Sequence, residues 1–241
     1  MEEMIKCENL CKKYGEQFAL KDLNLEIGRG KIVGLLGPNG SGKTTLIKIL
    51  CGLLKESSGR ALIEGRPPGL FTKSIISYLP DRLYFPDWMK VGGMIDFFGD
   101  FYADFDRKKS ESMCASLGIE MNQRIKTMSK GAKEKIQLAL VMSRKASLYL
   151  LDEPIAGVDP AARDFILNTI IANYNEAGTV VISTHLIMDI ERVLDEAIFL
   201  KDGRIVLHSS VDGIRQDNGK SVDAVFREIF KMSPYFETGK N

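Results

Sequence analysis

One short stretch of this sequence has the residue types and spacing of a loop that binds phosphate. It fits the pattern G-x-x-x-x-G-K-[ST]. In order, its residues are Gly37, Pro38, Asn39, Gly40, Ser41, Gly42, Lys43, Thr44 and Thr45. Its glycines let backbone N–H groups converge on phosphate oxygens, which Lys43 would neutralise, while the Thr44 hydroxyl would ligate Mg²⁺. The stretch therefore predicts a site for a nucleoside triphosphate with Mg²⁺.

Two acidic residues come at the end of a later apolar run. Tyr149–Leu151 is typical of a buried strand, and Asp152 and Glu153 follow it, where open α/β sheets place ligand-contacting groups. We expect Asp152 to hold Mg²⁺ through its water shell and Glu153 to polarise a water for attack on the γ-phosphate. The alternative is an acidic strand end that only faces solvent.

A histidine and a tyrosine are two further candidates. His185 follows the apolar run Thr179–Ser183, beside the predicted strand that carries Glu153, so it is a candidate for a second contact to the γ-phosphate. A purely structural histidine is the alternative. Tyr14 would offer a face on which an adenine ring stacks, or it would be a solvated residue of a turn.

These residues need a sheet that brings them together, and the order of predicted elements favours a parallel one. Ile32–Leu36 is typical of a buried strand that delivers the phosphate loop, and Leu46–Cys51 of a helix that leaves it. Further strands are predicted at Arg60–Glu64 and Ser74–Tyr78, and strands alternate with helices through the rest of the chain. We therefore predict an α/β fold, a P-loop NTPase core with a mostly parallel sheet.

Two smaller parts are predicted beside the core. Met4–Leu10 and Phe18–Ile27 alternate apolar and polar residues, which indicates an N-terminal antiparallel β subdomain. Helical spacing between Phe85 and Arg144, extending through Gln123–Met128, predicts an inserted helical subdomain. The resulting parts are an α/β core of residues 1–84 and 145–208, a helical subdomain of residues 85–144, and a short helical tail of residues 209–241.

The start of the predicted helical subdomain is rich in aromatic residues and methionine. Most of these side chains are expected to fill a small core. For Phe85, Trp88 and Met89 two interpretations stay open: membership of that core, or an exposed docking patch.

Composition argues against several classes of function. The 241 residues have a formal net charge of +1, so no overall field attracts nucleic acid or an anionic membrane. No apolar run reaches the roughly 18 residues of a transmembrane helix, and the N-terminus does not resemble a signal peptide. The four cysteines have no paired C-x-x-C spacing, which favours a reduced cytoplasmic compartment over a zinc site.

Together the motifs resemble the nucleotide-binding domain of an ATP-binding-cassette (ABC) transporter, over essentially the whole chain. Residues 37–45 are similar to Walker A and residues 148–152 to Walker B. The resemblance implies that Glu153 is the catalytic glutamate, His185 the switch histidine and Tyr14 the aromatic that stacks on adenine.

The signature and the Q-loop depart from the family pattern. Residues 128–132 occupy the place of the signature, normally Leu-Ser-Gly-Gly-Gln, and keep Ser129 and Gly131, which would contact a γ-phosphate. A lysine and an alanine stand at two other signature positions. The Q-loop glutamine is Asp81 here, which we expect to contact Mg²⁺. Pairing with the adjacent Arg82 is the alternative for Asp81.

The resemblance implies an ATP-hydrolysing subunit that binds ATP and Mg²⁺ at a dimer interface and drives a separate transmembrane permease subunit. Two cassettes, identical or different, would sandwich two ATP molecules, each phosphate loop facing the partner's signature. Such a subunit would be cytoplasmic and peripheral on the inner face of the cell membrane, without a nucleic-acid partner. The alternatives are a nucleotide-sensing switch with little turnover and a soluble family member that acts on chromosomes or ribosomes.

Overall fold

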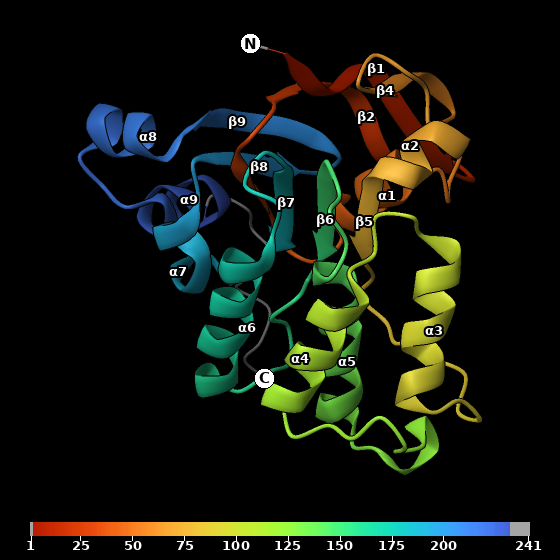
Figure 1. The fold of residues 1–241 in the computed structure, drawn as a ribbon. Helices are drawn as coiled ribbons and strands as arrows, with labels where there is room; N and C mark the ends of the chain where they lie inside the picture. The colour runs from red at the N-terminus through yellow and green to blue at the C-terminus, as the bar shows by residue number, and fades with distance from the viewer. Residues whose placement is uncertain (1, 232–241) are drawn as a thin grey trace, which may run out of the picture.

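The computed structural model describes residues 2–231 and contains two sheets (Figure 1). The smaller one is antiparallel, with the strand order β2-β1-β4. Its strands are β1 (Glu3–Tyr14), β2 (Gln17–Gly28) and β4 (Ser58–Ile63). In the β1–β2 hairpin, Tyr14 pairs with Gln17 beside the turn. This sheet confirms the predicted N-terminal antiparallel β subdomain.

The larger sheet has the strand order β5-β6-β7-β3-β8-β9 and is parallel except for β9. Its strands are β3 (Ile32–Leu36), β5 (Ile76–Leu79), β6 (Leu148–Asp152), β7 (Thr179–Thr184), β8 (Glu196–Lys201) and β9 (Arg204–Ser210). Every residue of β3, β6 and β7 is buried, as expected for strands covered on both faces. Since these three strands are parallel neighbours, the phosphate loop, Glu153 and His185 leave the same edge of the sheet.

Helices cover this sheet on both faces. The α-helices within residues 2–231 are α1 (Lys43–Leu50), α2 (Leu70–Ile75), α3 (Val91–Phe101), α4 (Arg107–Ser116), α5 (Lys130–Met142), α6 (Pro160–Asn173), α7 (Ile187–Ile190), α8 (Val211–Asn218) and α9 (Val222–Lys231). Helices α3, α4 and α5 pack together at one end of the molecule, away from the antiparallel sheet (Figure 1). Within residues 2–231, none of the helices is long and apolar enough to cross a bilayer.

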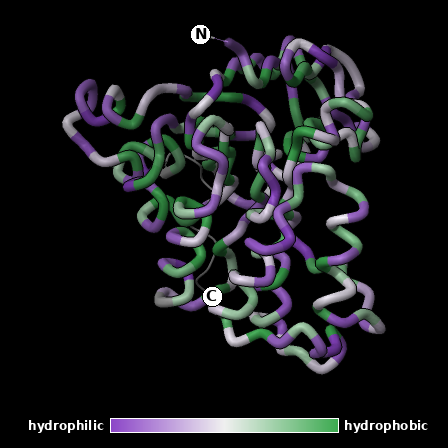
Figure 2. The backbone as a smooth tube through the Cα atoms, in the orientation of Figure 1, coloured by the Kyte–Doolittle hydropathy of each residue, from purple (hydrophilic) through white to green (hydrophobic). Residues whose placement is uncertain are grey.

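Two apolar cores lie on opposite faces of the large sheet. Successive side chains of a strand point to opposite faces, and in β6 Leu150 belongs to one core while Tyr149 belongs to the other. The first core fills the space between the two sheets around α1 and includes the buried side chains of Leu46 and Ile47. The second lies among the larger helices. Figure 2 shows the corresponding apolar colour along the strands.

The predicted strand Ser74–Tyr78 is wrong at its start, because residues 70–75 form the unpredicted helix α2. The backbone amide of Gly69 donates to the Thr72 hydroxyl at 2.8 Å, which closes the first turn of this helix. Strand β5 begins only at Ile76. The β-branched residues that suggested a longer strand are thus divided between two short elements.

The helical prediction for Gln123–Met128 is also wrong, since only a three-residue 3₁₀ turn forms there. The backbone of this segment pairs with the residues before and at the start of α3. The amide of Val91 donates to the carbonyl oxygen of Gln123 at 3.0 Å, and the amide of Ile125 donates to that of Met89 at 2.9 Å. Backbone groups used between segments are not available for a helix of their own.

The aromatic segment at the start of the helical region does not form one patch. Phe85 and Met89 pack against the core, whereas Trp88 is 79% exposed. The core interpretation therefore holds for two of these three side chains, and Trp88 lies outside the core.

Candidate nucleotide-binding site

The phosphate loop joins β3 to α1 and lies against β2 and β8. Gly40 and Gly42 have φ angles of +82° and +110°, in the region that favours glycine. A side chain at Gly42 would meet the carbonyl oxygen of Ala19 at 2.5 Å, and one at Gly37 would meet that of Leu200 at 2.5 Å. Other residue types at these positions would displace the loop.

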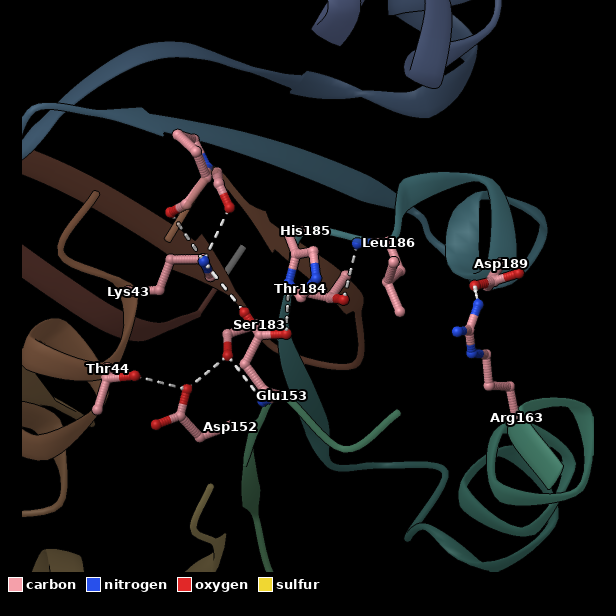
Figure 3. Close-up of polar contacts among 12 residues, drawn as sticks. Lys43, Thr44, Asp152, Glu153, Arg163, Ser183, Thr184, His185, Leu186 and Asp189 are labelled. Atoms are coloured by element: carbon pink, nitrogen blue, oxygen red, sulfur yellow. Dashed lines mark hydrogen bonds and ion pairs between the residues drawn. The ribbon is translucent and has the colours of Figure 1, made fainter. Parts of the chain in front are cut away.

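Lys43 is buried under this loop and is 5% exposed. Its ammonium group donates to the carbonyl oxygens of Gly37 at 2.8 Å and Pro38 at 3.2 Å. It also forms an ion pair with Oε1 of Glu153 at 3.1 Å (Figure 3). These acceptors hold the positive charge beside the loop, where bound phosphate oxygens would compete for it.

Asp152 carries a carboxylate oxygen suited to a cation. Its Oδ1 accepts hydrogen bonds from the hydroxyls of Ser183 at 2.6 Å and Thr44 at 3.1 Å, while Oδ2 is buried without a hydrogen-bond partner. Burial raises the pKa of the Asp152 carboxyl above its ordinary value; the bonds from Ser183 and Thr44 oppose this, and the charges of Asp81 and Glu153 add to it. Hydroxyl and carboxylate oxygens are the ligands that Mg²⁺ prefers, so Thr44 and Asp152 fit that ion.

Glu153 lies between Lys43 and His185. Its φ angle is +50°, in the left-handed region that residues with side chains rarely adopt. Its backbone amide donates to the carbonyl oxygen and the hydroxyl of Ser183 at 3.1 and 3.0 Å. One carboxylate oxygen pairs with Lys43, and the other lies 3.1 Å from Nδ1 of His185 (Figure 3). These partners fix the direction of the carboxylate, as a general base requires.

Ser183 is a member of this cluster that the sequence did not single out. Strands β6 and β7 are parallel neighbours, and Asp152 is in register with Ser183. The fully buried hydroxyl donates to Asp152 and accepts from the amide of Glu153, so one side chain holds both acids in place (Figure 3). A serine at the end of an apolar strand gives no signal of this role, which depends on how the strands pair.

A second connection that the sequence did not indicate lies beside the cluster. Nε of Arg163 donates to the carbonyl oxygen of Val158 at 2.9 Å. The same guanidinium pairs with Asp189 at 2.9 Å, as Figure 3 shows. Arg163 thereby links the segment after Glu153 to the helix after His185.

Asp81 follows β5 and lines the same cavity as Glu153 and His185. One oxygen of Asp81 also lies 4.0 Å from Nε of Arg82, whose side chain is 90% exposed. An exposed pair at that distance contributes little to stability. Sequence analysis left two alternatives for Asp81, a contact with Arg82 and a place in the nucleotide site. In the structure Asp81 is close to Arg82 and also lines the cavity.

Tyr14, Ser129 and Gly131 lie apart from this cluster. Tyr14 is 54% exposed beside the hairpin turn, with the Lys12 ammonium 5.4 Å from its ring centroid. Ser129 begins α5, where its hydroxyl accepts from the amide of Ala132 at 3.2 Å, and a side chain at Gly131 would meet open space. Across residues 2–231, no hydrogen bond or ion pair joins these three residues to the phosphate loop.

The fold and the site together define a phosphate-loop ATP-binding domain. The ABC transporter family matches residues 20–156. The SkfA peptide export ATP-binding protein SkfE of Bacillus subtilis is 31% identical over 210 residues, which cover 85% of this chain and 88% of that protein. The chain belongs to the ABC transporter family and is an ATP-binding subunit, the nucleotide-binding domain, of that family.

Solved structures show the same fold. The ATP-binding subunit of an ABC transporter superposes with a TM-score of 0.83 at 25% identity, covering 94% of this chain and 99% of that one. MJ0796, a bacterial ABC transporter cassette with a dimeric structure, gives a TM-score of 0.75 at 25% identity over 86% and 98%. Among eight similar curated proteins, the chain spans between 60% and 92% of the protein's own length. These likenesses confirm the predicted fold class.

Proposed function

We propose that the chain hydrolyses ATP in the presence of Mg²⁺ and that this hydrolysis drives transport by a separate membrane-spanning subunit. The observation that carries the proposal is the continuous set of contacts from Lys43 through Glu153 to His185, with Asp152 and Thr44 beside it. A lysine, a general base and two oxygen ligands are the groups that phosphoryl transfer to water needs.

Each side chain has a separate task in this mechanism. Bound Mg²⁺ would neutralise charge on the β- and γ-phosphate oxygens. Thr44 and Asp152 would hold the ion, Asp152 through its unpartnered Oδ2. Lys43 would leave Glu153 for the phosphates, and Glu153 would then accept the proton of the attacking water. His185 would orient Glu153 through Nδ1 and contact the γ-phosphate.

A second cassette would complete the site. Ser129 and Gly131 are exposed at the N-terminus of α5, where backbone N–H groups favour an anion. In a dimer, identical or mixed, these groups would face the partner's γ-phosphate, and Tyr14 would stack on the adenine bound to its own chain. The dimeric structure of MJ0796 supports this arrangement.

A transmembrane partner would bind in the groove between α2, β5 and α3. The groove has a volume of about 1190 Å³. Its lining includes the exposed apolar side chains of Leu53, Leu70, Tyr84, Phe97 and Phe101. Exposed apolar side chains around a groove are typical of an interaction surface. We propose that a cytoplasmic segment of the membrane subunit covers them, which would place the chain on the inner face of the cell membrane, with residues 85–144 as the moving helical subdomain.

The test of hydrolysis is Glu153→Gln, which keeps the shape of the side chain and removes the base. ATP turnover should fall at least about 100-fold while ATP binding is retained. Glu120→Gln, the same change at an exposed residue outside the cluster, is the matched control and should leave turnover unchanged. Turnover by Glu153→Gln within a few fold of the unaltered chain would refute the assignment of the base.

The presence of Asp81 favours one alternative, a nucleotide-sensing switch with little turnover. The carboxylate of Asp81 lines the cavity with Glu153 and adds negative charge near Asp152. In that case ATP-Mg²⁺ would bind and change the state of assembly, while the steady-state turnover of the unaltered chain would already be as low as that of Glu153→Gln.

A further inference from the structure

Three buried side chains join helix α5 to strand β5 through hydrogen bonds, called ties below, at successive positions along the two elements. Each tie joins a side-chain donor to a backbone carbonyl oxygen of the other element or the residues next to it. The pairs are Arg144 with Ile76, Ser77 with Val141, and Gln137 with Pro80. All three donors are at most 3% exposed. Residue numbers fall along α5 as they rise along β5, so Gln137 makes the last tie before the chain enters the Asp81 loop.

The side-chain amide of Gln137 contacts the backbone on both sides of Asp81. Its Nε2 donates to the carbonyl oxygen of Pro80 at 3.3 Å and faces that of Arg82 at 3.5 Å. Two carbonyl acceptors fix the direction of the amide, because the opposite orientation would set three oxygens against one another. Oε1 of Gln137 is buried without a partner.

The unpaired Oε1 atom helps to explain why residue 137 is a glutamine. A buried polar atom without a partner destabilises the folded chain, whereas an apolar side chain of the same size would fill the position without that cost. Packing alone does not explain Gln137. Its contribution lies in the donor group directed at the Asp81 loop.

We propose that Gln137 is a positioning residue that fixes the Asp81 loop to α5, so that the place of Asp81 in the nucleotide cavity follows the position of this helix. Gln137 and Asp81 line the same cavity as Glu153. Ser129 caps α5 eight residues before Gln137, which is about 12 Å along the axis of a rigid helix. A displacement of Ser129 by the partner's nucleotide is thereby transmitted to Asp81. This inference rests on the proposed function.

The experiment is a double-mutant cycle between Gln137→Leu and Asp81→Ala, measured as steady-state ATP turnover. Gln137→Leu removes the donor and keeps the volume. It should lower kcat about tenfold and change the KM for ATP less than twofold, because the loop is displaced while the phosphate loop is intact. In the Asp81→Ala background the same substitution should lower kcat less than twofold, since its effect acts through Asp81.

Ser77→Ala is the matched control, because it removes the next tie of α5 to β5 without touching the loop. It should leave kcat within about twofold and show no coupling to Asp81→Ala. Equal losses of kcat from Gln137→Leu in both backgrounds, or an equal effect of Ser77→Ala, would overturn the proposal and leave Gln137 with a packing role.

A second measurement does not depend on turnover. Hydrogen exchange of the backbone amides of residues 82–90, without nucleotide, should be faster in Gln137→Leu than in the unaltered chain and in Ser77→Ala. Unchanged exchange in these residues would contradict the proposed clamp. If the unaltered chain shows no turnover, the proposed hydrolysis fails, and exchange still decides whether Gln137 fixes the loop.

Discussion

At the scale of single residues, the site is arranged for a ligand at the expense of the stability of the free chain. Glu153 has a left-handed backbone, and Oδ2 of Asp152 is buried without a partner. Such features each cost free energy, and they persist where the surrounding structure holds them. Here Ser183 and Lys43 supply that support.

Asp152→Asn should therefore stabilise the nucleotide-free protein at neutral pH. Burial raises the pKa of Asp152, so the folded chain holds this proton more tightly than the unfolded chain. The stabilising contribution is complete below the ordinary pKa of aspartate and is lost as the pH rises through the raised value. We expect the melting temperature of Asp152→Asn at pH 8 to exceed that of the unaltered chain by about 2–4 °C.

Melting temperatures measured over a range of pH test whether the raised pKa of Asp152 is the cause of the stabilisation. Once the pH falls below the ordinary pKa of aspartate, about 3.9, Asp152 is protonated in the folded and the unfolded chain, and the difference in melting temperature should vanish. Asp217→Asn, at an exposed position of α8, is the control and should show no difference at either pH. An Asp152→Asn variant that melts below the unaltered chain at pH 8 would contradict the explanation.

At the scale of elements, the sequence predicted what depends on local pattern and missed what depends on neighbours. The apolar runs that became β3, β6 and β7 predicted the parallel sheet, because strands buried on both faces contain few polar residues. Helix α2 was missed, since six residues are too few for a helical period to show. Ser183 and Gln137 were missed for another reason: their partners are distant in the sequence and come from strand pairing or helix packing.

The loop after β5 gives a prediction at this scale. If Asp81 faces the metal, Asp81→Asn and Asp81→Gln should both shift the Mg²⁺ dependence of ATP turnover to higher concentration. Removing one carboxylate charge at a few ångströms predicts a shift of about threefold to tenfold. Glu120→Gln is again the control. An unchanged Mg²⁺ curve in both variants would place the side chain of Asp81 outside the metal site.

At the scale of the whole molecule, the residues proposed to contact ATP are divided between two surfaces. Lys43 and Asp152 lie at the edge of the large sheet, whereas Ser129 begins a helix and, among residues 2–231, forms no hydrogen bond with either of them. Under the proposed function, one chain would hold two halves of different sites, and two chains facing each other would complete both.

Two substitutions in a Glu153→Gln background test this division. Without hydrolysis, ATP-Mg²⁺ should accumulate a dimer, measured by light scattering. Adding Ser129→Arg should abolish the dimer and leave the Kd of the monomer for ATP within about twofold, because the arginine obstructs only the surface that meets the partner. Adding Lys43→Ala should abolish both, since the charge beside the phosphates is lost.

The comparison between the two variants decides whether the signature acts across the interface. Glu120→Arg introduces the same side chain at an exposed position outside α5 and should leave both the dimer and the Kd unchanged. If the Ser129→Arg monomer lost ATP binding as Lys43→Ala does, Ser129 would contact the nucleotide of its own chain. The two halves of the site would then belong to one molecule, and the dimer would not be needed to complete it.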